Sequence, residues 1–222
     1  MKKLINGIVE FRRKARPEYA EVFAKLALEQ KPDTLFIACS DSRVVPNLFA
    51  STDPGDLFVI RNVGNLVCPC DHDGRVQGDE SEVAAIELAL AWLPVVDIVV
   101  CGHSECGAMR ALAAGREDVR LPHVRSWLRH GEEALRLLKA GADSDKSLPL
   151  YDQLSQQNVL QQLEHLRTHP TVRDRLQAGT LRLHAWWFDI RHADVYAFEP
   201  EKGRFVILDE EEAARMMARM PG

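Results

Sequence analysis

Hydrophobic runs of strand length recur through the middle of this 222-residue chain. Residues 34–39, 57–61 and 95–101 are apolar almost throughout, rather than alternating between apolar and polar positions. Such continuity is typical of strands that are covered on both faces, as in a parallel sheet between layers of helices. We therefore expect these runs to be strands of a buried, mostly parallel sheet.

Helical patterns fill much of the remaining chain. Between the second and third runs, apolar residues recur on one helical face: Val83, Ile86, Leu90 and Leu93. A strand, a helix and a strand in this order predict a right-handed parallel crossover. Further helices are expected over 122–139 and 150–169, and further strands over 181–188, 195–198 and 204–208. The predicted fold class is α/β.

The first 30 residues predict a helical arm. We expect two helices that separate before Pro17, because proline is favoured at a first helical position and disfavours helix in the residue before it. Apolar side chains recur at helical spacing in this arm: Leu4, Ile5, Ile8 and Phe11. They must cover either the body of the domain or a second subunit. Residues 1–222 contain no stretch with the composition of a linker between domains, so we expect one domain.

Composition narrows the classes of function. The chain is 46% hydrophobic and 27% charged, which is ordinary for a globular domain. Its net charge of -5 gives no electrostatic reason to expect nucleic acid or an anionic membrane as partner. No segment reaches the roughly 18 uninterrupted apolar residues that a membrane span requires. Five cysteines, two of them spaced for metal binding, do not suit a secreted disulfide framework, so we expect a cytoplasmic protein.

Two short motifs carry the candidate chemistry. Cys39-x-Asp41-x-Arg43 closes the first apolar run, and His103-x-x-Cys106 closes the third. In doubly wound α/β proteins, ligands bind beyond the carboxyl ends of parallel strands. Two thiolates and one imidazole suit zinc, and three protein ligands leave one coordination position open. The pattern therefore indicates a catalytic zinc site.

Each of these residues has an ordinary alternative when it is taken alone. A buried cysteine such as Cys39 is more often a small core residue than a metal ligand. The joint occurrence of both motifs at two strand ends favours the site. We also expect Ser104 to cap a following helix, which puts Cys106 in the first turn, where free amides favour a thiolate.

With their flanking residues, the motifs resemble the β-class carbonic anhydrases. The matching segments are 39–43 (CSDSR), 102–108 (GHSECGA), 55–62 (GDLFVIRN) and 183–186 (LHAW), and the resemblance covers most of the chain. It implies a core of four parallel strands that is extended by an antiparallel edge strand and flanked by helices. It also implies obligate homodimers with further assembly, in which the arm over residues 1–30 packs on a partner subunit.

The resemblance implies one Zn²⁺ per subunit on Cys39, His103 and Cys106, and reversible hydration of carbon dioxide to bicarbonate and a proton. The nucleophile would be a zinc-bound hydroxide, because zinc lowers the pKa of bound water. As a carboxylate, Asp41 can only accept hydrogen bonds and would therefore orient this hydroxide. Arg43 would hold Asp41 ionised through a paired contact.

Further positions are predicted from the same resemblance. Family members with a bicarbonate-controlled closed state carry tryptophan and glycine where this chain has Phe36 and Ala38, and plant-type members carry a glutamine where it has Gln30. The open, plant-type arrangement is therefore expected, with Gln30 donating a hydrogen bond to substrate.

The resemblance also supplies the expected walls of the substrate site. Phe58 and Val63 would provide an apolar surface, in part across the dimer interface, and the Gly107 amide would face the substrate. One departure concerns Leu88, which stands where many plant-type members have a tyrosine. A leucine there cannot donate a hydrogen bond or relay a proton.

Two other functions fit the sequence. The same zinc site could hydrolyse COS or CS2, or the chain could be a non-catalytic zinc or redox-sensing module that retains the fold. Cys68-x-Cys70-x-His72 could bind a second metal or form an oxidisable pair, although incidental loop residues are the preferred interpretation. The proton acceptor is left unassigned among His72, His123 and His130.

Overall fold

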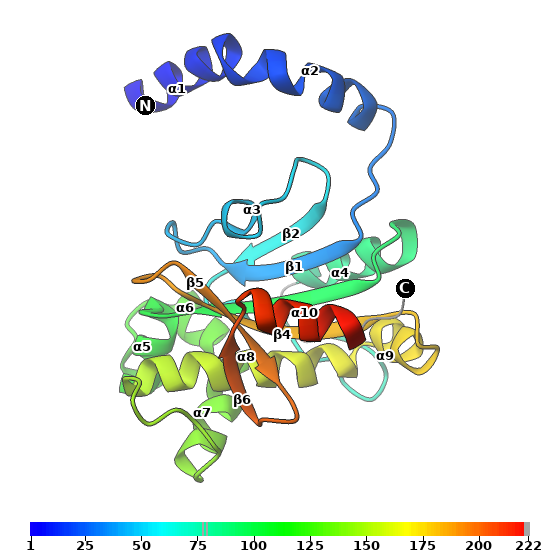
Figure 1. Cartoon of the computed structure of the whole chain (residues 1–222). Coiled ribbons are helices and arrows are strands. Elements are labelled where there is room, and N and C mark those ends of the chain that lie inside the picture. The colour runs from blue at the N-terminus through cyan, green and yellow to red at the C-terminus, as the bar shows by residue number, and fades with distance from the viewer. Residues whose placement is uncertain (77, 79, 220–222) are drawn as a thin grey trace.

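A six-stranded sheet forms the centre of the molecule (Figure 1), in a computed structural model that describes residues 1–76, 78 and 80–219. The strands are β1 (Thr34–Cys39), β2 (Leu57–Asn62), β3 (Asp97–His103), β4 (Arg182–Asp189), β5 (Asp194–Glu199) and β6 (Arg204–Ile207). Their spatial order is β2-β1-β3-β4-β5-β6. The first four in this order are parallel, and β5 and β6 are added antiparallel. The predicted α/β class and mostly parallel sheet are confirmed, with two antiparallel strands instead of one.

Helices make up most of the rest of the described chain. They are α1 (Lys2–Arg13), α2 (Ala15–Leu26), α3 (Pro46–Phe49), α4 (Glu80–Trp92), α5 (Gly107–Ala114), α6 (Pro122–Trp127), α7 (Glu132–Lys139), α8 (Leu150–Thr168), α9 (Pro170–Gln177) and α10 (Glu210–Arg219). The long helix α8 packs along β3 and β4, while α4 lies beside β2 and α9. The sequence pattern did not predict α3, α9 or α10.

The central strands are buried on both faces, as their continuous apolarity predicts. Along β1, Leu35 and Ile37 join a core cluster that includes Ile86 of α4 and Val159 of α8. The intervening Phe36 joins a second cluster on the opposite face of the sheet. This alternation follows from the two-residue period of a strand. Covering both faces fixes the register of β1 and β3, and with it the positions of the residues at their carboxyl ends.

The arm formed by α1 and α2 stands away from the sheet (Figure 1). None of its helical residues is buried, and Leu4 and Ile8 are 64% and 67% exposed. The two predicted helices are confirmed, but they separate at Lys14, earlier than the expected boundary directly before Pro17. Pro17 instead lies within the first turn of α2, where its missing N–H has no intrahelical partner to lose.

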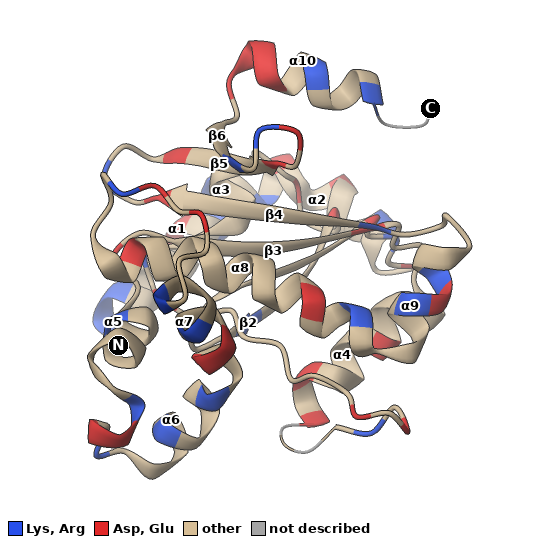
Figure 2. Ribbon diagram, turned by 90° about the horizontal axis from the view of Figure 1, so that it is seen from below, with Lys and Arg blue, Asp and Glu red and all other residues tan. Residues whose placement is uncertain are grey.

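In Figure 2, the positions of basic and acidic residues are interspersed along the helices and loops of the ribbon. The ribbons of β3 and β4 are mostly uncharged along their length. Within the part of the chain that the structure describes, no helix combines the length and the apolar character that a membrane crossing needs.

Candidate metal centre and active site

The carboxyl ends of β1 and β3 bring three ligand atoms together. Cys39 is the last residue of β1, His103 is the last residue of β3, and Cys106 follows three residues later. The two sulfur atoms and an imidazole nitrogen all lie within 4.8 Å of one another, and all three residues are buried. Because β1 and β3 are adjacent and parallel, their ends meet at the same edge of the sheet.

The protonation state of His103 suits a metal ligand. Its Nδ1 lies 2.8 Å from the carbonyl oxygen of Ser104, which can only accept, so Nδ1 carries the proton. The other ring nitrogen, Nε2, is buried and lacks a hydrogen-bond partner among the described residues. A buried acceptor without a partner is costly in a folded protein. A cation bound to Nε2 would remove this cost, so the residues fit a metal ion.

The two thiols point to a cation of charge two. The hydrogen bond from Cys106 lowers the pKa of Cys39, although burial opposes this effect. The same contact with Cys39, together with burial, raises the pKa of Cys106. Both thiols can therefore ionise together only if a positive charge lies between them. The N–H of Gly64 also donates to the Cys39 sulfur at 3.4 Å.

The turn after β3 differs from the expected helix cap. The helix α5 begins at Gly107, and Cys106 is its N-cap residue. Ser104 does not cap this helix, so that expectation is wrong. Its hydroxyl donates to Asp189 at 3.2 Å and accepts from the N–H of Ile190 at 2.9 Å. Ser104 therefore ties the ligand turn to the end of β4.

Asp41 and Arg43 form a two-pronged ion pair beside the ligands. The Arg43 Nε and Nη2 atoms donate to the two carboxylate oxygens of Asp41 at 2.9 and 2.7 Å, and the Arg43 amide donates to Oδ1 at 3.0 Å. The guanidinium hydrogen bonds hold the pKa of Asp41 well below its usual range, although burial opposes them. Asp41 is therefore ionised and fixed in orientation at neutral pH.

Arg61 braces the segment between the ligand and the carboxylate. From β2, its Nε and Nη2 atoms donate to the Cys39 carbonyl at 3.0 and 2.8 Å, and Nη2 donates to the Asp41 carbonyl at 2.6 Å. The sequence analysis included Arg61 in the resemblance but gave it no role. Its place at the end of an apolar run beside the first motif is the signal that could have identified it.

Two of the predicted substrate residues lie next to the ligands. Val63 follows β2 directly, is 43% exposed, and its carbonyl accepts a hydrogen bond from Trp127 at 2.7 Å. The next residue is Gly64, which contacts the Cys39 sulfur. Gly107 is exposed, with open space beside its Cα within the described chain.

The other two predicted substrate residues are remote within one subunit. Phe58 is paired in register with Leu35 and packs on the core, whereas Cys39 is paired with Asn62. This separation is four residues along the strand, or about 13 Å. Gln30 precedes β1, whose length of about 17 Å separates it from the ligand end. Within one subunit, neither residue therefore lies beside the three ligands.

The remaining sequence candidates do not extend the site. Cys68 is buried, with its sulfur 3.3 Å from Nε2 of His130, whereas His72 is largely in solvent. Cys70 is partly buried, so these motif residues do not converge on one ion. Leu88 is partly buried on α4.

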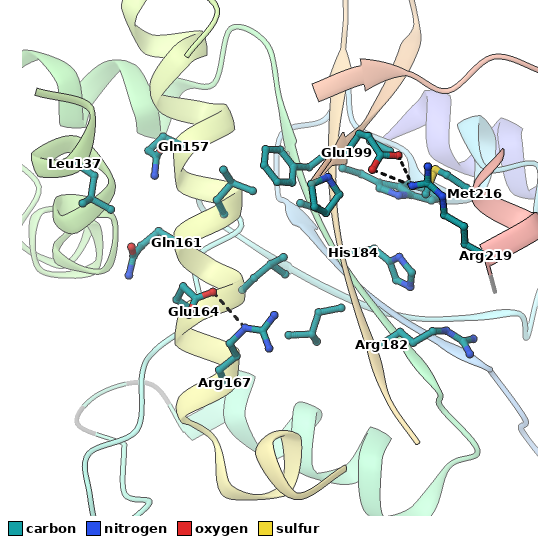
Figure 3. A pocket seen from close by; sticks show the side chains of 18 residues that line it. Leu137, Gln157, Gln161, Glu164, Arg167, Arg182, His184, Glu199, Met216 and Arg219 are labelled. Atoms are coloured by element: carbon teal, nitrogen blue, oxygen red, sulfur yellow. Dashed lines mark hydrogen bonds and ion pairs between the residues drawn. The ribbon is translucent and has the colours of Figure 1, made fainter. Parts of the chain in front are cut away.

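Two clefts flank α8, away from the ligand cluster. Figure 3 shows the one of about 590 Å³, whose lining includes Gln157 and Arg167 of α8 and Arg182 and His184 of β4. The other, of about 630 Å³, lies between α8, β5 and β6. Neither is lined by Cys39, His103 or Cys106. The candidate centre is therefore a compact site at the sheet edge and not one of these clefts.

Sequence comparisons agree with this geometry. A family model described as "Carbonic anhydrase" matches residues 34–195. A carbonic anhydrase of Pseudomonas aeruginosa is 44% identical over 222 residues, which cover 100% of this chain and 98% of the relative. Carbonic anhydrase 1 of Escherichia coli O157:H7 is 44% identical over 209 residues, covering 94% of this chain and 92% of the relative.

Solved structures show the same fold. The β-carbonic anhydrase CcaA superposes with a TM-score of 0.84 at 38% identity, covering 93% of this chain and 98% of the other. A structure from work on two tetrameric β-carbonic anhydrases of Sordaria macrospora gives a TM-score of 0.69 at 30% identity, covering 93% and 95%. The family model, the relatives and the sheet-edge cluster together show that the chain belongs to the β-carbonic anhydrase family.

Proposed function

We propose that this protein catalyses the reversible hydration of carbon dioxide to bicarbonate and a proton at a zinc ion held by Cys39, His103 and Cys106. The observation that carries the proposal is the buried Nε2 of His103, which lies within 4.8 Å of two thiols and has no hydrogen-bond partner among the described residues. When bound there, zinc supplies a Lewis acid that makes a water molecule nucleophilic near neutral pH. Family membership supports the same reaction.

The chain's own residues orient the reaction. Asp41 is ionised, so it can only accept, and it fixes the direction of an O–H bond beside the three ligands. With zinc bound, Asp41 would in this way orient the attacking oxygen toward the carbon of the substrate. Arg43 holds the carboxylate in that position and keeps it off the metal ligands. The proposed arrangement is the open, plant-type one, which Phe36 and Ala38 also favour.

The substrate pocket lies between a strand end and a helix start. Val63 contributes an apolar wall, which suits a molecule without a dipole, and the Gly107 amide faces the substrate. A three-atom substrate needs no cavity of the size found beside α8. Gln30 and Phe58 complete the pocket from a second subunit, because neither reaches the ligands within its own chain.

A homodimer is accordingly the proposed minimum unit, with residues 1–222 acting as one domain and the arm over 1–30 packing on the partner. The exposed apolar side chains of α1 and α2 support this, since a monomer would leave them in water. Further assembly is consistent with the relatives from Sordaria macrospora, which are described as tetrameric. The proposed compartment is the cytoplasm.

The test is a metal analysis paired with a stopped-flow assay of carbon dioxide hydration on one preparation. We expect one zinc per subunit and hydration far above background. Asp41→Ala should keep the zinc and lose most of the rate, whereas Asp174→Ala, an exposed carboxylate on α9, should change neither. A zinc-loaded wild-type protein without hydration would favour a non-catalytic module. Faster turnover of COS or CS2 than of carbon dioxide would favour a hydrolase.

A further inference from the structure

One peptide group connects the ligand histidine to a buried carboxylate. The carbonyl of Ser104 accepts the hydrogen bond from Nδ1 of His103 at 2.8 Å. The N–H of the same peptide group belongs to Glu105 and donates to Oδ1 of Asp152 at 2.7 Å. A chain of two hydrogen bonds therefore runs from the imidazole to the carboxylate across a single peptide bond.

Asp152 is an unusual residue for its place in the fold. It lies in the first turn of α8, where an acidic residue ordinarily faces solvent and favours the helix dipole. Here it is only 4% exposed, and it makes no side-chain hydrogen bond to cap its own helix. Burial raises its pKa to about 6, so its ionised form at neutral pH is held at a free-energy cost. A residue that only capped the start of α8 would not need to be buried in this way.

The turn between the two ligands depends on the same contact. Glu105 is in the left-handed region with φ of 60°, which a residue with a side chain adopts only where its surroundings fix it. Its carbonyl accepts from Arg43 at 3.2 Å, and its carboxylate is held by the Tyr151 hydroxyl at 3.1 Å and by Arg110. Asp152 fixes the remaining polar group of this residue, its N–H.

We propose that Asp152 is a positioning residue that strengthens His103 as a metal ligand through the Ser104–Glu105 peptide. A negative charge at one end of a hydrogen-bonded chain polarises the groups along it, so the Ser104 carbonyl becomes a stronger acceptor. The imidazole then becomes a stronger donor at Nε2, as it does when a carboxylate pairs directly with a ligating histidine. This role rests on the proposed zinc centre.

The test is Asp152→Asn, which keeps an oxygen for the Glu105 N–H but removes the charge. We expect zinc affinity, measured by competition with a chelator, to fall about tenfold, the lower end of the range for outer-shell partners. The midpoint of the pH profile of kcat/KM should move to lower pH, because a weaker imidazole donor leaves the metal more acidic. The second result separates polarisation from a merely structural role, which would weaken binding without moving the midpoint.

Asp189→Asn is the matched control, because Asp189 also approaches this turn but contacts the Ser104 hydroxyl instead of its peptide group. It should leave the midpoint and the zinc affinity close to those of wild type. The proposal is overturned if Asp152→Asn matches wild type in both measurements, or if the two variants shift the midpoint equally. Wild-type protein that binds no zinc would instead refute the proposed function. Failure of the proposed role of Asp152 can therefore be distinguished from failure of the proposed function.

Discussion

Replacing Arg43 with lysine tests whether the geometry of the Asp41 ion pair matters beyond its charge. Lysine keeps a positive charge but has one donor group on a flexible stem, so it cannot reproduce the fork of the guanidinium. Arg43→Lys removes the contacts of 2.9 and 2.7 Å to the carboxylate, and the contact of 3.2 Å to the Glu105 carbonyl. The backbone amide contact to Asp41 at 3.0 Å remains.

The expected loss follows from the exposure of the pair. Hydrogen bonds to charged groups contribute about 1.5–3 kcal/mol each when buried, whereas exposed ion pairs contribute about 0.2–1 kcal/mol. The Arg43 side chain is 47% exposed and that of Asp41 is 18% exposed, so the pair lies nearer the exposed limit. The fork consists of two contacts, and about 0.7 kcal/mol for each gives about 1.4 kcal/mol, which corresponds to about a tenfold change in the population of correctly oriented Asp41.

Stopped-flow hydration is the assay, with zinc content measured on the same sample. The rate constant kcat should fall about tenfold while zinc remains bound. Because an unperturbed aspartate has a pKa of about 3.9, Asp41 stays ionised at neutral and alkaline pH in the variant as well. The loss should therefore be equal at about pH 7 and about pH 9, where that carboxylate does not titrate.

Arg136→Lys provides the control, because Arg136 on α7 makes the same forked contact to Glu133 on the surface. It should leave kcat unchanged. A zinc-loaded Arg43→Lys protein with the wild-type rate would refute the orienting role of the fork. A loss that disappears at high pH would refute the geometric explanation in favour of titration.

Three further predictions follow from the contacts. Cys106→Ser should lose stoichiometric zinc as well as activity, and retention of tightly bound zinc, measured by metal analysis, would disprove the ligand assignment. Deleting residues 1–30 should lower the molar mass measured by light scattering to that of a monomer, and lower hydration because Gln30 is removed; an unchanged mass would exclude the arm from the interface. The third prediction concerns Asp97. Burial raises the pKa of this carboxyl group, but hydrogen bonds from His184 and Arg182 outweigh burial and lower the pKa to about 2. This stabilisation is present above an unfolded pKa of about 3.9 and is lost as pH falls through about 2, so the free energy of urea unfolding should fall by about 2 kcal/mol more in wild type than in Asp97→Asn over that window.

The parts of the fold that follow from local pattern were predictable. Continuous apolarity identified β1 and β3 because strands covered on both faces leave no polar positions. Since parallel strands place their carboxyl ends at one edge, the positions of Cys39 and His103 in the sequence already implied that they approach each other. The pairing of Arg43 with Asp41 was anticipated from the family resemblance, whereas the additional contact of Arg43 with Glu105 was not.

The parts that depend on distant packing were not predictable. Asp152 lies 47 residues beyond Glu105, in a helix whose sequence pattern carries no sign of a contact with the ligand turn. Its role appears only when α8 is laid along β3 and β4. Ser104 was misassigned for the same reason, because a hydroxyl near a helix start can cap that helix or contact another strand. In this fold the Ser104 hydroxyl hydrogen-bonds Asp189 and Ile190 at the end of β4.

The charges around the centre explain why the arginines and the carboxylate occur together. With zinc bound as proposed, the cation and two thiolates sum to zero, and Asp41 adds one negative charge. Arg43 cancels it directly through its forked contact. Without Arg43 the site would carry excess negative charge and repel bicarbonate, and the free carboxylate would be drawn to the metal as a fourth ligand. Arg61, which holds the Cys39 and Asp41 carbonyls, adds a positive charge that favours the anion. In the proposed site, Arg43 would therefore keep the coordination position open, and both guanidinium groups would favour binding of the charged product.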